Sequence, residues 1–367
     1  MKKSLLVAAL ITGFAGVAQA ETSVTLYGIA DAGIGYERLK GSDGEESFKA
    51  TRTGLLSGGQ SSSRWGLKGS EDLGQGLKAV FVLENGFNLG TGSTSQGRLF
   101  GRQATVGLQS DAWGRLDFGR QTNIASKYLA GVVSPFGTDF GLAKAGTTFS
   151  ATNSVRYDNM VMYQTPNFSG FQFGVGYSFN NDGSQQFKQS GGEQPNTRAW
   201  TTGLRYANGP IAAGVTYDQL KTPGTLPADE RDVSIKAWNL GASYDFEVAK
   251  VHAGFGQTRN GWLSAIEFGD FESDDGGYIV EDGLKVNSYT LGLSAPVGAN
   301  GKVLAAWGMA DPRDAEGLEK QQVYSLGYTY ALSKRTNVYA IGSYVKNFAF
   351  AEDLKATQVG VGLRHQF

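Results

Sequence analysis

Apolar and polar residues alternate along most of the chain. Segment 171–179 reads Phe-Gln-Phe-Gly-Val-Gly-Tyr-Ser-Phe, so its apolar side chains share one face and Gln, Gly and Ser share the other. A period of two predicts β-strands with two unlike faces, and runs with the helical period are nearly absent. The same pattern returns in segments 211–217, 238–246, 289–293, 324–330 and 359–363. The alternation therefore predicts an all-β protein.

Short turns and long polar stretches follow one another between these segments. Turn sequences stand at 111–114, 166–170, 208–210, 298–301 and 333–336. Long polar stretches, expected to be loops, stand at 41–61, 180–197, 221–234, 261–285 and 311–321. Tight turns at one end and long loops at the other are typical of an up-and-down barrel.

The segments number about 16, and their lengths suit tilted membrane strands of about 9–11 residues. In the first half we expect strands at 23–36, 62–71, 77–88, 98–109, 114–121, 154–164, 171–179 and 199–206. In the second half we expect them at 211–220, 234–246, 250–258, 286–295, 302–309, 322–332, 337–348 and 357–367.

The number of strands separates a barrel from a sandwich. A sandwich of about 16 strands needs two domains, and the sequence shows no linker. A closed barrel has no sheet edges, which lets it span a membrane, and at this size its lumen is a water-filled channel. The chain also ends on an aromatic residue, Phe367, on the same face as Val361 and Leu363. We therefore expect a 16-stranded antiparallel transmembrane β-barrel.

The first twenty residues have the form of an export signal. Lys2 and Lys3 precede an apolar run at 5–17, and Ala18-Gln19-Ala20 matches a cleavage site. We expect cleavage after Ala20, which leaves 21–367 as a single barrel domain. The apolar run is too short to span a bilayer, and no later run of about 18 apolar residues predicts a transmembrane helix.

Composition argues against several kinds of site. The 367 residues include no cysteine, which excludes disulfides, a thiolate nucleophile and Cys-based zinc binding, and the two histidines, His252 and His365, are far apart. A formal net charge of −1 argues against nucleic-acid binding through bulk charge. No serine motif accompanies His252, so we expect no enzymatic activity. We also expect no cofactor.

Four segments carry a resemblance to a known family. They are Val24-Thr25-Leu26-Tyr27-Gly28, Ser63-Arg64-Trp65-Gly66-Leu67-Lys68-Gly69-Ser70-Glu71-Asp72-Leu73-Gly74, Phe118-Gly119-Arg120-Gln121 and the last strand to Phe367. With these, the chain resembles the general porins of Gram-negative outer membranes, most closely the trimeric β-proteobacterial type. The resemblance implies a homotrimer, set among outer-membrane lipid and lipopolysaccharide, that passes small hydrophilic solutes and ions by passive diffusion. It also implies that the barrel-assembly machinery reads Phe367.

The resemblance further implies an inward-folded third loop that forms a constriction, at about 122–148. Family members often carry Pro-Glu-Phe-Gly there, with an acid facing the pore, whereas this chain has Pro135-Phe136-Gly137 without that Glu. Asp139 is the nearest acid, and Lys127 and Lys144 are the bases of the loop. A plain surface loop is the alternative interpretation of this segment.

Family constrictions set wall arginines against this loop, and matching motifs selects Arg64, Arg102 and Arg156. Trp65 follows Arg64 and Leu67 precedes Lys68, and both apolar side chains are expected to point outward. Alternation therefore predicts that Arg64 and Lys68 point into the lumen. By the same rule Arg156 points inward, opposite to its neighbour Tyr157.

Two further arginines have an ambiguous direction. Arg102 shares the parity of Ala104 and Val106, which are apolar and expected to face outward. Arg120 is a candidate from its motif, yet it shares the parity of Phe118. An outer side that faces protein, as at a trimer contact, is one explanation.

Arginines keep their charge at any relevant pH, and rings of Arg or Lys favour anions in pores. Three or four arginines against one acid predict a net positive constriction and an anion-preferring channel. The long loops hold much of the acid, and one acidic run is a weaker candidate for Ca²⁺ than for a solvated loop. Its members are Glu272, Asp274, Asp275, Glu281 and Asp282.

Two other functions stay open. A substrate-specific sugar or anion channel would line its path with stacked aromatic side chains, whereas the predicted inward positions are mostly Gly, Ser, Thr and charged residues. An outer-membrane adhesin-type barrel would fold without conducting ions.

Overall fold

The wall of the molecule is one antiparallel sheet. The computed structural model describes residues 23–43, 46–264, 268, 277–313 and 315–367. In the first half its strands are β1 (Ser23–Asp43), β2 (Glu46–Ser57), β3 (Arg64–Gly74), β4 (Leu77–Gly86), β5 (Gln103–Ser110), β6 (Gly114–Thr122), β7 (Arg156–Tyr157), β8 (Met160–Gln164) and β9 (Phe171–Ser178). In the second half they are β10 (Arg198–Asn208), β11 (Ile211–Lys221), β12 (Ser234–Asp245), β13 (Lys250–Trp262), β14 (Ile279–Val297), β15 (Gly301–Arg313), β16 (Gln321–Ala331), β17 (Thr336–Lys346) and β18 (Lys355–Gln366).

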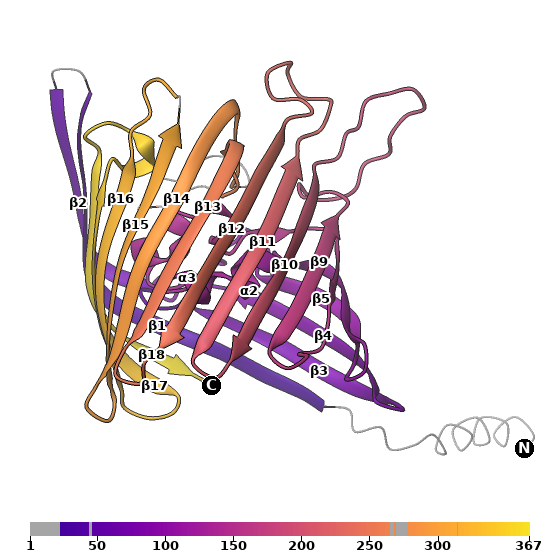
Figure 1. Cartoon of the computed structure of the whole chain (residues 1–367), viewed down its shortest axis with the longest axis horizontal. Coiled ribbons are helices and arrows are strands. Elements are labelled where there is room, and N and C mark those ends of the chain that lie inside the picture. Colours follow the sequence, from indigo (N-terminus) through magenta and orange to yellow (C-terminus); the bar gives the residue numbers. More distant parts are fainter. Residues whose placement is uncertain (1–22, 44–45, 265–267, 269–276, 314) are drawn as a thin grey trace, which may run out of the picture.

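The sheet closes on itself, because β18 pairs with β1 (Figure 1). Among the described residues, the segments amount to sixteen wall strands. The upper part of β1 pairs with β2 and its lower part with β3, so β2 and β3 are two pieces of one strand. In the same way β7 and β8 both pair with β6. The predicted 16-stranded antiparallel barrel is confirmed.

Side chains alternate between a lipid-side face and a lumen face, as the sequence pattern predicts. On β12, Trp238 and Leu240 are exposed on the outside, whereas Asn239 between them is 1% exposed. Many large apolar side chains are exposed in this way on the outer wall, a surface suited to lipid rather than to water. Among the described residues, no helix has the length and hydropathy to cross a membrane.

Several strand boundaries differ from the sequence prediction. One is that of β14, which begins at Ile279, inside the expected loop 261–285. The stretch 41–61, expected to be a loop, instead extends the wall, because β1 runs to Asp43 and pairs with β2 along a long hairpin. Polar side chains are compatible with a strand here, since both faces of the hairpin are largely exposed beyond the barrel. The strand expected from residue 98 begins only at Gln103, after an irregular segment.

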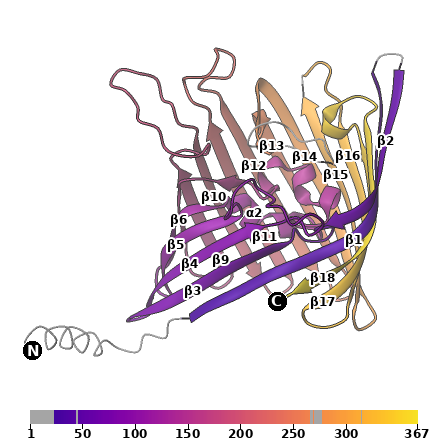
Figure 2. The same cartoon turned by 180° about the vertical axis from the view of Figure 1, so that it is seen from behind.

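The loop between β6 and β7 folds into the lumen instead of covering the rim. It contains two short α-helices, α2 (Ile124–Tyr128) and α3 (Ala130–Val133), followed by the 3₁₀ turns η1 (Gly141–Ala143), η2 (Ala145–Thr147) and η3 (Ser150–Thr152). Both views place the two α-helices inside the ring of strands (Figures 1 and 2). A further 3₁₀ turn, η4 (Phe348–Phe350), lies between β17 and β18.

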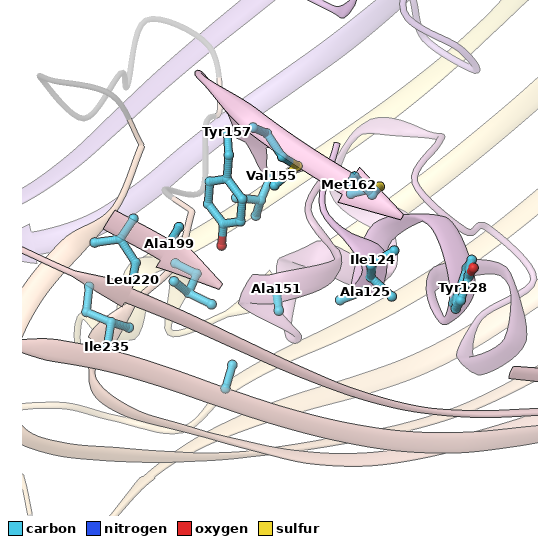
Figure 3. Packing of buried hydrophobic residues seen from close by; sticks show 13 residues of the cluster. Ile124, Ala125, Tyr128, Ala151, Val155, Tyr157, Met162, Ala199, Leu220 and Ile235 are labelled. Atoms are coloured by element: carbon cyan, nitrogen blue, oxygen red, sulfur yellow. The ribbon is translucent and has the colours of Figure 1, made fainter. Parts of the chain in front are cut away.

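The buried apolar core lies between this inner loop and the wall. Ile124, Ala125 and Tyr128 of α2 pack with wall residues such as Ala199 and Leu220 (Figure 3). The wall makes room with glycines: a Cβ at Gly241 or Gly254 would approach Val133 of α3 within 3 Å. Inward glycines therefore act as sockets for the side chains of the loop, which accounts for part of the high glycine content.

The barrel seam joins the two ends of the described chain. The Gly28 amide donates to the Phe367 carbonyl oxygen at 3.1 Å, and the Phe367 amide donates back to the Gly28 carbonyl at 3.1 Å. A Cβ at Gly28 would lie 2.3 Å from the Phe367 ring. The absence of a side chain at Gly28 thus lets the last residue lie flat across the seam.

We predict that Gly28→Leu weakens seam closure, because the new side chain and the Phe367 ring would occupy the same space. Overpacking of this kind typically costs about 1–3 kcal/mol. The measurement is the fraction of folded, heat-modifiable barrel after refolding into detergent over a urea series. Gly54→Leu is the control, since nothing lies within 4 Å of a Cβ there. Equal folding of the two variants would contradict the seam argument.

Candidate functional site

The inner loop lines one side of the lumen. Helix α2 contacts β9, β10 and β11, α3 contacts β11 to β14, and η1 contacts β16 and β17. The loop therefore lies along the wall from β9 round to β17, and the strands β3 to β6 form the other side of the passage (Figure 2). The space between the loop and these strands is the site.

Polar groups of the wall hold the loop at both of its ends. Asn123, which caps α2, donates from its amide to Asp218 Oδ1 at 2.8 Å, and the Ile124 amide donates to Thr201 Oγ1 at 2.8 Å. At the far end the Gln321 amide donates to the Thr147 carbonyl oxygen at 2.6 Å. The loop is thereby fixed against strands that are far apart in the sequence.

The tip of the loop is tied to a break in the wall. Residues 58–63, between β2 and β3, leave the strand, and the Phe140 amide donates to the Gln60 carbonyl oxygen at 2.7 Å. Asp31 holds this break, accepting from the Ser61 amide at 2.6 Å and from the Tyr339 hydroxyl at 2.7 Å. The interruption of the second wall strand therefore gives the tip of the loop its own anchor.

One cavity of the lumen gathers most of the predicted site residues. Its charged lining is Arg64, Arg102, Arg120, Asp139, Lys144 and Arg156. Lys68, also predicted for this site, is not part of that lining. It stands four residues after Arg64 on β3, and its Nζ lies 5.2 Å from the centre of the Tyr27 ring.

Two of the arginines form ion pairs with carboxylates. Arg102 Nε donates to Glu84 Oε1 at 2.7 Å, and the Tyr27 hydroxyl donates to the other oxygen of Glu84 at 2.9 Å. Arg120 forms an ion pair with Asp158 at 2.5 Å. Arg98 also pairs with Asp158, at 2.7 Å, so that acid is shared between two bases. Glu84 therefore offsets the charge of Arg102, whereas Asp158 offsets that of Arg120 only in part.

The other two arginines have no carboxylate partner among the described residues. Arg64 Nε donates to the Ser62 carbonyl oxygen at 2.9 Å, and Arg156 Nε donates to the Arg102 carbonyl oxygen at 3.2 Å. Carbonyl oxygens orient a guanidinium without cancelling its charge. Arg64 and Arg156 thus supply uncompensated positive charge on the wall.

The ambiguous direction of Arg102 and Arg120 has a backbone explanation. Arg102 stands one residue before β5 begins, so strand parity does not govern its side chain. Arg120 follows Gly119, whose φ of +117° is left-handed, at a point where the pairing of β6 shifts between β8 and β7. Such bulges redirect side chains. Both arginines reach the cavity even though their parity points outward.

Asp139 is the acid of the loop in this cavity. Its Oδ2 accepts from the Ser61 hydroxyl at 3.2 Å, and the same Ser61 oxygen accepts from Arg364 Nε at 3.1 Å. Burial raises the pKa of the Asp139 carboxyl above its ordinary value, and the nearby Arg64 opposes part of that rise. The acid therefore lies within the field of the arginines.

The two bases of the loop differ in position. Lys144 lines the cavity. Lys127 is in the last turn of α2 and donates from Nζ to Gln121 Oε1 at 2.8 Å. Burial lowers its pKa to about 8. His252 contacts the Val132 carbonyl oxygen at 2.9 Å through Nδ1, so it belongs to loop packing.

Sequence reasoning missed Glu84 and Asp158, the partners of Arg102 and Arg120. Glu84 left a signal, because it interrupts an apolar segment at an inward position opposite Gly66. No sequence pattern indicated Asp158, because it stands in the gap between β7 and β8, where the register shifts.

The described part of the chain contains no cluster of three or more acids or histidines arranged to hold a metal ion. Of the acidic run considered for Ca²⁺, Glu272, Asp274 and Asp275 lie outside the described residues, whereas Glu281 and Asp282 are part of β14.

Comparison with known proteins gives a consistent match over the whole length. A family model described as Gram-negative porin matches residues 6–348. The chain is 54% identical over 386 residues to an outer membrane porin protein of Bordetella pertussis, and 35% identical over 389 residues to outer membrane porin protein 32 of Delftia acidovorans, with all of both chains covered in each case. A solved structure titled anion-selective porin from Comamonas acidovorans superposes with a TM-score of 0.73 at 30% identity, covering 94% of this chain and 100% of that one.

Proposed function

The chain belongs to the Gram-negative porin family, and we propose that its channel prefers anions. The protein is an outer-membrane porin, a diffusion channel rather than a member of an enzyme class. The proposal concerns the sign of its selectivity and the residues that set it.

The observation that carries the proposal is the imbalance of charge in the lumen cavity. Arg102 and Arg120 are paired with acids, but Arg64 and Arg156 are not, and Asp139 is the acid of the cavity lining. Guanidinium groups beside a narrow water path attract anions and repel cations. We assign Arg64 and Arg156 to anion attraction, and Asp139 to a transverse field that orients polar solutes.

The paired arginines have a different role in this proposal. Arg102 and Arg120 hold the wall of the constriction in shape through Glu84 and Asp158. Lys68 adds positive charge below the narrow point. The segment 122–148 would serve as the constriction loop, since it lines the lumen on the side opposite these side chains. That one similar structure is titled an anion-selective porin supports the same sign.

A substrate-specific channel is the second candidate. Three aromatic side chains stand near the charged groups: Tyr157 and Tyr278 line the cavity, and Tyr27 donates to Glu84. A sugar path needs a run of stacked aromatic rings, and the charged lining favours small anions instead. We therefore propose general passage of small hydrophilic solutes with a preference for anions.

The remaining proposals concern processing and assembly. We propose that residues 1–20 are removed after Ala20 during export, and that 21–367 form the mature barrel. We propose that the barrel assembles as a homotrimer, with lipopolysaccharide among its surrounding lipids. The exposed ring of Phe367, at the end of a β18 strand that pairs with β1, would be the signal for the barrel-assembly machinery.

We predict that the double variant Arg64→Gln and Arg156→Gln loses most of its preference for chloride. Two unit charges about 8 Å apart in wet surroundings interact by about 0.5–1 kcal/mol. Loss of two arginines should therefore lower the chloride-to-potassium permeability ratio roughly fivefold or more. The measurement is the reversal potential of single channels in a planar bilayer under a KCl gradient.

The matched control for this experiment is Lys68→Gln, which removes a positive charge from the lumen wall outside the cavity. We expect it to change the reversal potential much less than the double arginine variant does. A wild-type channel that selects cations would overturn the charge assignment while leaving the porin intact. A folded barrel without conductance would favour the adhesin-type alternative.

We predict that acidification strengthens the preference for anions. Because burial raises the pKa of Asp139, its carboxyl takes up a proton at a pH above the ordinary aspartate value of about 3.9. Protonation removes the negative charge, so the chloride-to-potassium ratio should rise as the pH falls through this range. The reversal potential recorded over a pH series tests this, and Asp139→Asn should remove the step. A step that persists in that variant would assign it to another group.

A further inference from the structure

A row of basic side chains crosses the outer wall near the long-loop end of the barrel. Lys236 lies opposite Arg259, Arg259 opposite Lys285, and Lys285 opposite Arg313, on the adjacent strands β12 to β15. All four have the parity of the outward residues, and three are exposed while Lys285 is half-buried. The wall therefore presents four neighbouring positive charges to the outside.

Such a row is unfavourable by itself, because like charges directly opposite each other destabilise a sheet. Among the described residues, Arg313 is the one member with an acid partner, Asp311 at 3.0 Å. Lys320 also approaches Asp311, at 3.6 Å, which divides the charge of that acid between two bases. The basic row thus retains an excess of positive charge that calls for an external anion.

The outward residues below the row follow the order of a membrane interface. Next toward the middle of the wall come the amides Gln257 and Asn287, and beside and below them the aromatic residues Trp238, Phe255 and Tyr289. The rings are in contact, with centroids 5.3 Å apart for Trp238–Phe255 and 5.1 Å apart for Phe255–Tyr289. Aromatic girdles mark the headgroup level, so the basic row lies where lipid phosphates lie.

An apolar groove continues down the same strands. Its floor includes the small residues Ala213, Ala242 and Ala253, and its sides include Leu240 and Trp307. Ala253 is six residues from Arg259 on β13, a distance of ~20 Å along the strand. A basic row with an apolar groove beneath it has the shape and polarity of a phosphorylated lipid.

We propose that this face binds one molecule of lipopolysaccharide, with the phosphates of its lipid A part on the basic row and an acyl chain in the groove. Arginine and lysine side chains bind phosphate through charge-assisted hydrogen bonds, and arginine does so with two at once. The inference rests on the outer-membrane location of the porin. It is independent of the charge of the pore, which lies on the other face of the wall.

A second basic row lies on the same wall, and the single strand β16 separates it from the first row. Its members, opposite one another on β2, β1, β18 and β17, are Lys49, Lys40, Lys355 and Lys346. Because that row can also attract anionic lipid, the experiment has to count bound molecules per barrel as well as measure total affinity.

The test uses the full porin purified in detergent and bisphosphorylated lipid A as the probe, with bound molecules counted by native mass spectrometry. The row variant carries Lys236→Gln, Arg259→Gln and Lys285→Gln. The control variant carries Lys188→Gln, Lys334→Gln and Arg335→Gln, which remove the same charge from an outer loop and a turn at the opposite end. We expect the row variant to bind one lipid A fewer per barrel, with that site weakened about tenfold or more, and the control to bind as wild type.

Three further arms decide between ligands. Lipid A without phosphates should bind equally well to wild type and to the row variant. Inorganic phosphate at millimolar concentration should not displace bound lipid A, because phosphate has no acyl chain to occupy the groove. Ala213→Leu with Ala253→Leu fills the groove and should weaken lipid A binding without any change of charge. Unchanged single-channel conductance in all variants shows that they fold and separates this result from the proposed selectivity.

Equal lipid A counts for the row and control variants would overturn the proposal. So would equal binding of the dephosphorylated lipid. Loss of trimers in the row variant, with lipid binding retained, would assign the face to contact with a second copy of the chain instead.

Discussion

The structure depends on one constraint: inside a bilayer, each backbone amide and carbonyl must find its partner within the protein. A sheet meets this condition only when its first and last strands pair, as β1 and β18 do. Closure fixes a ring of sixteen strands with one face toward lipid and one toward the lumen. Because one face meets lipid and the other meets water, apolar and polar residues alternate along the sequence. The same difference explains the exposed Leu, Val and Trp side chains, which would be unfavourable in water.

A closed ring of this size has more interior than its own side chains can fill. The loop between β6 and β7 occupies part of that space. Its side chains pack against glycine positions of the wall, and hydrogen bonds to wall residues hold it there. Because the loop takes one side, the charges on the other side meet the water path. Arg64 and Arg156 matter for this reason: their neighbours Arg102 and Arg120 have carboxylates within 2.7 Å, and they have none among the described residues.

The sequence predicted the barrel well because alternation is a local signal repeated in each strand. It also indicated Arg64, Arg156 and Asp139, which the structure brings to one cavity. It failed where the backbone leaves regular geometry. The side chains of Arg102 and Arg120 are redirected by a strand end and by the bulge at Gly119, and Asp158 meets Arg120 across a register shift. A rule based on parity cannot describe such places, because each depends on pairing between strands that are distant in the sequence.

The seam between Gly28 and Phe367 has a consequence for how the chain reaches its membrane. The strands that close the ring are the first and the last, so the ring cannot close while any part of the polypeptide is still being synthesised or exported. Until the final residue arrives, the polymer must cross an aqueous compartment with its edges unpaired. Its frequent Gly, Ser, Thr and charged residues interrupt each apolar stretch and so serve a second purpose. They keep the unfolded chain soluble until it is inserted into the membrane.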